Sequence, residues 1–121
     1  DSFFKKRIFK LHNFGKHSRD FTYIDDVVKI IFKLMQNNKK LKDNDVLNIC
    51  SNKPISLNEI INFLKENKIN PRIKKVALQK ADIIKTHGNN AKLLKYIKYN
   101  RFANWKESII KVIDWYKINM I

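Results

Sequence analysis

The alternation of three short apolar segments with longer amphipathic ones constrains the fold of this chain most. Residues 8–11, 46–50 and 73–78 have the compact apolar pattern of strands, and the first runs into a turn at 12–15 whose Asn and Gly tolerate unusual φ values. Three short strands are too few for a parallel sheet, which is normally covered on both faces. The sequence therefore predicts an α/β chain with an incomplete sheet whose neighbouring strands are missing.

The first helix is predicted from a capping signal and a long apolar stripe. Thr22 precedes Asp25 by three residues, a spacing that lets a hydroxyl and a carboxylate bond the first free amides of a helix. Apolar side chains then recur at helical spacing. We expect this helix to end near Gln36 and a polar loop to follow over residues 37–45.

Three further helices are expected later in the chain. Ser56 and Glu59 have the Ser/Thr-x-x-Asp/Glu spacing of a capping box, directly before another apolar stripe. Asn89 is a candidate cap for a short helix, and Asn104 with Glu107 opens a last one. The predicted architecture is a few short strands with three main helices and one short helix.

The length and the scarcity of certain residues exclude several classes of protein. A chain of 121 residues with 44% apolar side chains is enough for about one domain. The single cysteine, Cys50, excludes an internal disulfide framework, and we expect it to be a small buried residue. The two glycines, Gly15 and Gly88, exclude a glycine-rich dinucleotide loop. No apolar run approaches the ~18 residues of a membrane helix, so we expect a soluble, cytoplasmic protein without a membrane partner.

The net charge of +15 invites a nucleic-acid interpretation, which other features weaken. Lysine, isoleucine and asparagine are all abundant and all have A/T-rich codons, so a skewed genome can supply the lysines. The lysines are scattered, no block reaches five like charges, and arginine, the residue for bidentate phosphate or base contacts, is scarce. A solvated basic surface is the favoured account, and no nucleic-acid partner is expected.

One long run resembles the signature of a known family. Residues 13–28 read N-F-G-K-H-S-R-D-F-T-Y-I-D-D-V-V and are similar to the N-x-G-x-x-x-R-D-F-T-Y-I-D-D-I/V-V signature of nucleotide-sugar epimerases. These enzymes are extended short-chain dehydrogenase/reductases that bind NAD. The run most resembles UDP-glucuronate 4-epimerases, since related dehydratases tend to carry a Trp where Phe21 stands.

The resemblance continues in register to the end of the chain. Residues 46–49 resemble the family's Y-N-I-G strand, 78–83 its M-Q-P-G-D-V loop, 86–89 its T-x-A-D stretch and 112–116 its closing F-V-x-W-Y. The resemblance implies a single C-terminal nucleotide-sugar-binding domain over residues 1–121, which is a portion of a larger epimerase. The Rossmann half, which by resemblance binds NAD, is absent.

The residues that carry the family's redox chemistry are also absent. The sequence has neither the G-x-x-G-x-x-G loop nor the Y-x-x-x-K pair, because no tyrosine is followed by a lysine four residues later. Proton abstraction from the sugar C4 hydroxyl needs a tyrosine whose pKa is lowered by a lysine and a nearby cofactor charge. We therefore expect no catalytic and no cofactor-binding residue in this chain, and no epimerisation by it alone.

Two residues are the main candidates for substrate binding by resemblance. Arg19 opens the R-D-F-T-Y stretch, and the family's arginine there contacts the UDP pyrophosphate with a planar, always-charged fork. The alternative is a structural ion pair of Arg19 with Asp20 or Asp25. Asp82 stands at the aspartate that approaches the ribose hydroxyls in related epimerases, although Lys80 and Ala81 replace the usual Pro-Gly. Its alternative role is a helix cap before residues 83–84.

Three weaker candidates complete the predicted substrate site. Gln79 stands where some relatives have a phosphate-binding arginine. His12 and Asn13 precede the signature, where relatives pack on the uracil base, and His12 could stack there or be an ordinary surface histidine. Asp25 and Asp26 are more readily explained by the helix dipole than by acid–base chemistry. No metal site is expected, because His17 and His87 have no partners at ligand spacing.

The resemblance implies the UDP-sugar-binding part of an NAD-dependent epimerase, which in the intact enzyme inverts C4 through a keto intermediate. The implied partners are UDP-glucuronate or a UDP-hexose and the N-terminal Rossmann portion, and relatives usually form homodimers. Polysaccharide biosynthesis is the implied setting. Two alternatives stay open: a dehydratase or decarboxylase of the same superfamily, and a non-catalytic basic binding module.

Overall fold

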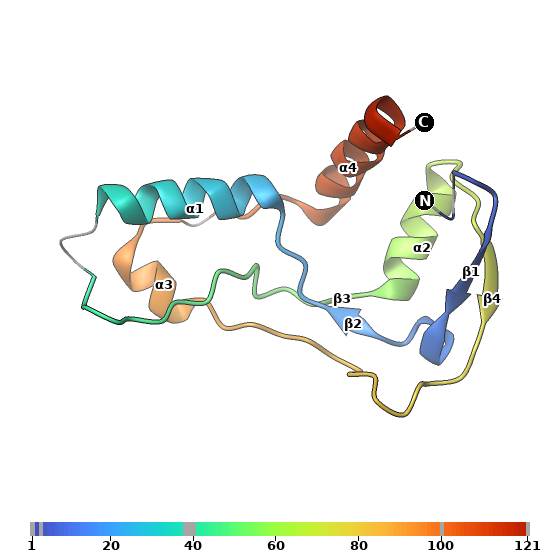
Figure 1. The fold of residues 1–121 in the computed structure, drawn as a ribbon, viewed down its shortest axis with the longest axis horizontal. Helices are drawn as coiled ribbons and strands as arrows, with labels where there is room; N and C mark the ends of the chain where they lie inside the picture. The colour runs from blue at the N-terminus through green and yellow to red at the C-terminus, as the bar shows by residue number, and fades with distance from the viewer. Residues whose placement is uncertain (1, 3, 38–40, 100, 121) are drawn as a thin grey trace. The chain divides into compact units, whose positions relative to one another are not determined.

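The computed structural model describes residues 2, 4–37, 41–99 and 101–120, and the chain divides into two compact units. Unit 1 consists of Asp1–Asp20 and Lys53–His87, and unit 2 of Phe21–Asn52 and Gly88–Ile121. Figure 1 shows that both units are built from stretches that are far apart in sequence. Strands lie in unit 1, whereas unit 2 holds three of the four helices among the described residues. The predicted α/β class, with three main helices and a short one, is confirmed.

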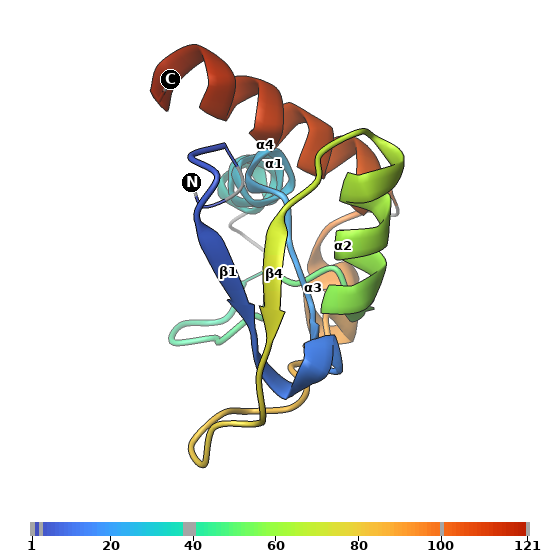
Figure 2. The same cartoon turned by 90° about the vertical axis from the view of Figure 1, so that its right-hand side faces the viewer.

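Unit 1 contains a small parallel sheet covered by one helix. Strands β1 (Ile8–Leu11) and β4 (Arg72–Lys75) pair in parallel, with Leu11 opposite Lys75. Helix α2 (Leu57–Glu66) lies beside this pair in Figure 2. Leu11 is 1% exposed, and Ile61 and Leu64 of the helix are also buried. These residues form the core of unit 1, and β4 confirms the first part of the strand predicted over 73–78.

A second ladder in unit 1 was not predicted. Strands β2 (Ser18–Arg19) and β3 (Ile55–Ser56) pair antiparallel, with Ser18 opposite Ser56. The pairing continues into the start of α2, because the amide of Leu57 donates to the carbonyl of His17 at 2.9 Å. Strands of two residues give no periodic pattern, so the sequence carries no signal for them.

The turn predicted at 12–15 is confirmed as a short 3₁₀ element, η1 (His12–Gly15). Asn13 and Gly15 have positive φ values of 48° and 79°, as expected of residues that tolerate this region. Phe14 also has a positive φ of 52°, which the sequence did not suggest. A Cβ at Gly15 would lie 2.1 Å from the Asn58 side chain, so glycine also permits the close approach of α2.

Unit 2 packs two helices and two extended segments around a small apolar cluster. Its helices are α1 (Ile24–Gln36), α3 (Ala91–Tyr96) and α4 (Trp105–Met120), which confirms the predicted end near Gln36. Ile30 of α1 and Leu93 of α3 are fully buried beside Ile97. The predicted cap of α4 is present, since Asn104 accepts from the Lys106 amide at 2.9 Å. Asn89 is not the N-cap of α3, because Asn90 holds that position without a side-chain cap bond, although Asn89 Oδ1 accepts from the Ala91 amide at 2.9 Å.

The predicted capping box at the start of α1 is wrong. Tyr23 is the N-cap residue, and no side chain caps the helix. Thr22 lies one residue too early for its hydroxyl to reach the first free amides. Asp25 and Asp26 do lie in the first turn, where their charges favour the helix dipole.

The strand predicted over residues 46–50 is also wrong, since this segment is extended without a strand partner among the described residues. Its apolar pattern is explained by packing, because Leu47 and Ile49 contact the cluster around Ile30 and Cys50 is buried. Side chains replace a ladder here: Asn90 donates to the Cys50 carbonyl at 2.8 Å, with its own side chain buried. Residues 38–40 of the predicted polar loop lie outside the described residues.

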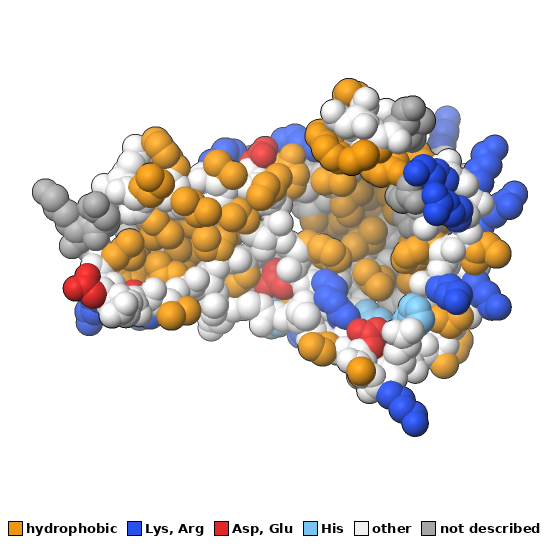
Figure 3. All heavy atoms as spheres, viewed as in Figure 1, with side chains coloured by type: hydrophobic (Ala, Val, Ile, Leu, Met, Phe, Trp, Pro, Cys, Tyr) orange, Lys and Arg blue, Asp and Glu red, His pale blue; other side chains and the backbone are white. Residues whose placement is uncertain are grey.

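Helix α1 has apolar side chains on more than one face. Ile30 and Leu34 pack inward, whereas a second set is exposed, namely Ile24, Val28, Ile31, Phe32 and Met35. Figure 3 shows orange side chains gathered over this helix. An exposed apolar stripe of this kind marks a surface that another element normally covers. No helix among the described residues is long and apolar enough to cross a membrane.

Asp26 joins α1 to the segment that follows α3. Its side chain is buried, and it accepts hydrogen bonds from the Tyr99 hydroxyl and from the Ala103 amide, the latter at 2.9 Å. The structural role expected for this carboxylate is consistent with these contacts. Burial and the bond to Asp26 raise the pKa of Tyr99 to about 12.

The capping box of α2 should stabilise the folded chain. Ser56 Oγ accepts from the Glu59 amide at 3.1 Å, and the Glu59 carboxylate accepts from the Ser56 amide at 2.9 Å, as the spacing predicted. Ser56→Ala should lower the free energy of unfolding by about 1 kcal/mol, measured by urea titration with circular dichroism. Ser108→Ala, which removes a hydroxyl bonded to the Asn104 carbonyl within α4, is the control and should change it little. An equal loss in both variants would contradict the role of the cap.

The raised pKa of Tyr99 predicts a loss of stability in alkali. A phenol whose pKa is higher in the folded state stabilises that state below pH 10, and the contribution is lost as pH rises to about 12. The free energy of unfolding should therefore fall over this range more steeply in the wild type than in Tyr99→Phe, because lysine titration is common to both proteins. Absorbance of tyrosinate at 295 nm gives the titration directly, and identical profiles in the two proteins would refute the assignment.

Candidate functional site

The segment around Ser18 is held on both sides by backbone hydrogen bonds within unit 1. One side pairs with β3. On the other side, the Ser18 amide donates to the Ile84 carbonyl at 3.0 Å, and the Thr86 amide donates to the Ser18 carbonyl at 3.1 Å. The Asp20 amide adds a bond to Thr86 Oγ1 at 3.2 Å. This double pairing fixes the backbone from which the Arg19 side chain projects.

The Arg19 guanidinium is oriented by three acceptors. Nη1 donates to the carbonyls of Ser18 and Ile84 at 2.9 and 3.2 Å, and Nη2 donates to Asp82 Oδ1 at 3.2 Å. Arg19 and Asp82 lie 63 positions apart in sequence, yet their side chains form an ion pair. Each of the two side chains is about 30% exposed. The structure thus brings together the two main candidates, and the partner of Arg19 is Asp82 instead of Asp20 or Asp25.

A buried histidine stands behind this pair and was assigned no role from the sequence. His17 is 2% exposed, and its Nε2 lies 3.2 Å from Asp82 Oδ2, the oxygen that Arg19 does not use. Nε2 is fully buried and has no hydrogen bond of good geometry. His17 and Asp82 are 65 positions apart, so no local spacing could have indicated the contact. The Asp82 carboxylate therefore lies between a guanidinium and an imidazole.

The loop that carries Asp82 is a turn without a helix. The Asp82 amide donates to the Gln79 carbonyl at 3.1 Å, which closes a tight turn over Lys80 and Ala81. The alternative role of Asp82 as a helix cap is therefore wrong, since no helix follows it. Gln79 is exposed at the start of the same turn, three residues before Asp82 in sequence. Its side chain is therefore accessible.

The remaining candidates lie elsewhere in unit 1. His12 and Asn13 belong to η1, directly after β1. Among the described residues, no hydrogen bond or ion pair joins either of them to Arg19 or Asp82. His12 Nδ1 is buried without a hydrogen-bond partner. No group of three or more metal-ligating side chains is found in the part of the chain that the structure describes.

The arrangement offers a cation and an anion side by side at a partly exposed surface. Arg19 has further N–H groups with which to contact phosphate oxygens, and a carboxylate such as Asp82 can accept from hydroxyl groups. Because the guanidinium is already held by carbonyls, it loses little conformational freedom when an anion binds. The geometry is suited to a ligand that carries both phosphates and hydroxyls.

Comparisons with known proteins agree with these motifs. Residues 5–50 match the model of the NAD dependent epimerase/dehydratase family. Protein CapI of Staphylococcus aureus is 30% identical over 123 residues, covering 88% of this chain and 36% of that protein. The UDP-glucuronate 4-epimerase of Thermodesulfobacterium geofontis is 28% identical over 120 residues, covering 97% of this chain and 36% of that enzyme. The chain thus spans little more than a third of the length of these relatives.

A solved structure gives the same result for the fold. MoeE5 in complex with UDP-glucuronic acid and NAD superposes with a TM-score of 0.80 at 18% identity, covering 96% of this chain and 38% of that one. At this identity the likeness concerns the fold alone, and the relation to the family rests on the sequence matches. The run around Arg19, the α/β fold and these matches all relate the chain to the NAD dependent epimerase/dehydratase family, whose model residues 5–50 match.

Proposed function

We propose that this chain is the UDP-sugar-binding part of an NAD-dependent nucleotide-sugar epimerase similar to UDP-glucuronate 4-epimerases. The ion pair between Arg19 and Asp82 is the observation that carries the proposal. One residue comes from the R-D-F-T-Y stretch and the other from the loop similar to M-Q-P-G-D-V, and both stretches were connected with the nucleotide by resemblance. Their contact makes one site out of two independent motifs.

In this proposal, Arg19 binds the pyrophosphate of UDP. A guanidinium matches two phosphate oxygens with two parallel N–H groups, and its charge persists at every pH of interest. The bonds from Nη1 to the Ser18 and Ile84 carbonyls hold the group in place, whereas the bond from Nη2 to Asp82 is the one that an incoming phosphate can share or replace. The net charge of +15 adds a general attraction for the nucleotide.

Asp82 accepts the ribose hydroxyls, and His17 supports it from the buried side. The carboxylate uses one oxygen for each of its two neighbours, Arg19 and His17, so its plane is defined before a ligand binds. Gln79 contributes an uncharged amide next to the phosphates. His12 and Asn13 contact the uracil base, for which a flat imidazole is a suitable stacking surface.

NAD and the catalytic residues belong to another part of the protein. The two glycines of this chain cannot form a G-x-x-G-x-x-G cradle, and no tyrosine stands four residues before a lysine. The apolar face of α1 is exposed, which supports the proposal that a neighbouring portion of the protein covers it. A Rossmann portion is the proposed occupant. The homodimer, the cytoplasmic location and the role in polysaccharide biosynthesis stay predictions.

This chain would contribute by anchoring the nucleotide. NAD, when bound by the intact protein, would supply reversible hydride transfer at the sugar C4 carbon, and the oxidised sugar would have to turn to be reduced on its other face. Contacts with the UDP lie far from the reacting carbon, so they retain the intermediate without restraining the sugar. Retention through Arg19 and Asp82 is thus compatible with rotation of the hexose.

The contribution of Arg19 is tested with UDP and a matched arginine variant. Arg19→Ala should weaken UDP binding by roughly 10- to 100-fold, the effect of losing a charge-assisted bidentate contact, measured by isothermal titration calorimetry. Arg72→Ala removes the same charge from an exposed position on β4 and should change the affinity less than about threefold. Equal losses in both variants would mean that only the overall charge attracts UDP. No UDP binding by the wild type would overturn the proposed function.

Asp82 is tested by comparing two parts of the ligand. Asp82→Asn should weaken binding of uridine by roughly tenfold, because an amide accepts the ribose hydroxyls less well than a carboxylate. Binding of inorganic pyrophosphate should stay equal or become tighter, since Arg19 loses its competing anion. Asp114→Asn, in an exposed i,i+3 pair on α4, is the control and should leave both affinities unchanged. Weaker pyrophosphate binding in Asp82→Asn, with uridine unaffected, would contradict the assignment.

A further inference from the structure

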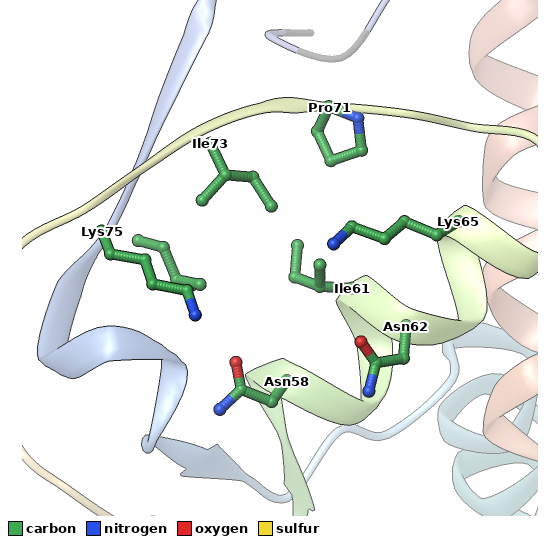
Figure 4. Close-up of a pocket in the computed structure, with 8 residues that line it drawn as sticks. Asn58, Ile61, Asn62, Lys65, Pro71, Ile73 and Lys75 are labelled. Atoms are coloured by element: carbon green, nitrogen blue, oxygen red, sulfur yellow. The ribbon is translucent and has the colours of Figure 1, made fainter.

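Unit 1 contains a concave site that shares no residue with the Arg19–Asp82 pair. A pocket of about 400 Å³ opens between α2 and β4, which is the size of many small-molecule sites. Its floor is apolar and consists of Leu11, Ile61 and Ile73, of which the first two are buried. Figure 4 shows the polar side chains around this floor, with both lysine amino groups directed into the pocket.

Lys75 lies at the end of β4 and lines the pocket. Side chains alternate along a strand, so Ile73 and Lys75 share the face of β4 that is turned to the pocket, while Arg72 and Lys74 share the other. The register places Lys75 opposite Leu11, which is 1% exposed. The Lys75 side chain is itself exposed, so β4 presents an accessible ammonium group to the pocket beside a buried leucine.

The helix contributes polar side chains to the same space. Asn58, Asn62 and Lys65 follow at spacings of four and three residues, so they lie on one face of α2 together with Ile61. The amide of Asn58 is held by a bond of its Nδ2 to the Phe14 carbonyl at 3.3 Å. Two amides and two ammonium groups therefore surround one apolar floor.

The charges of the pocket are not balanced. None of its lining residues is acidic. Among the described residues, neither Lys65 nor Lys75 forms an ion pair or a hydrogen bond through its amino group. Two cations that share one concave site repel each other, and an anion placed between them removes that repulsion.

We propose that this pocket binds a small organic anion, in which a carboxylate or phosphate head group is attached to an apolar ring or short chain. The head group lies between Lys65 and Lys75, and the amides of Asn58 and Asn62 offer further hydrogen bonds. The apolar part rests on Leu11, Ile61 and Ile73. This site is separate from the proposed UDP site and does not depend on it.

The proposal is tested with four probes that separate the head group from the apolar body. Benzoate and phenyl phosphate carry both parts, benzyl alcohol lacks the charge, and inorganic phosphate lacks the ring. Backbone amide shifts in an NMR titration of the protein should move around Ile61 and Ile73 and saturate with benzoate or phenyl phosphate. Benzyl alcohol and inorganic phosphate should each bind roughly tenfold more weakly. Whichever of the first two binds more tightly identifies the head group, and binding of neither at millimolar concentration overturns the proposal.

Two lysines of the same strand provide the matched variants. Lys75→Met keeps the length of the side chain without its charge, and it should weaken binding of the preferred probe roughly tenfold. Lys74→Met changes the other face of β4 and should have less than a twofold effect, while Lys75→Arg should restore most of the affinity. Lys65→Met removes the other positive charge of the pocket, which comes from α2, and should weaken binding likewise. Equal losses for Lys74→Met and Lys75→Met would show only general attraction to a basic chain and would refute the site.

Discussion

The backbone pairing on both sides of Ser18 determines where the candidate site of unit 1 lies. Strand β2 is bonded to β3 on one side and to the segment around Lys85 on the other, so two stretches of distant sequence meet at it. Arg19 projects from this strand, and Asp82 comes from the stretch that leads to Lys85. The bonds between Ser18, Ile84 and Thr86 hold the stretch that carries the carboxylate next to the guanidinium.

Local signals in the sequence predicted several features that local bonds decide, although the capping box expected from Thr22 and Asp25 does not form. The Ser56–Glu59 capping box involves two residues three positions apart, and both of its reciprocal bonds are present. Asn13 and Gly15 in η1 have the positive φ values that their side chains tolerate. In these places the energy of the observed conformation depends on neighbours within four residues, so a reading of the sequence alone can find it.

Prediction failed at several places where distant segments decide the structure. Residues 46–50 have the pattern of a buried strand, but the same pattern is found in a segment that packs its apolar side chains on Ile30 and Leu93. Side chains bond this segment instead of a ladder, since Asn90 donates to the Cys50 carbonyl and Asn48 donates to the Asn89 carbonyl. Periodicity reports burial and cannot distinguish these two outcomes. His17 was missed for a related reason, since its only sign of a role is a carboxylate 65 positions away. Arg19 and Asp82 were found through a family resemblance, and their contact was not derivable from spacing.

The positively charged groups of unit 1 differ in how firmly their neighbours hold them, and this difference affects how they recognise anions. Arg19 is held by two carbonyls and one carboxylate, so its direction is set and an anion gains most from its geometry. Lys65 and Lys75 have flexible stems and no partner among the described residues, so an anion gains there from charge and from the apolar floor beneath. A rigid fork selects a phosphate by shape, whereas a pair of mobile ammonium groups adapts to several head groups. A net charge of +15 therefore does not make the surface uniformly anion-binding, because selectivity depends on the acceptors and apolar side chains around each cation.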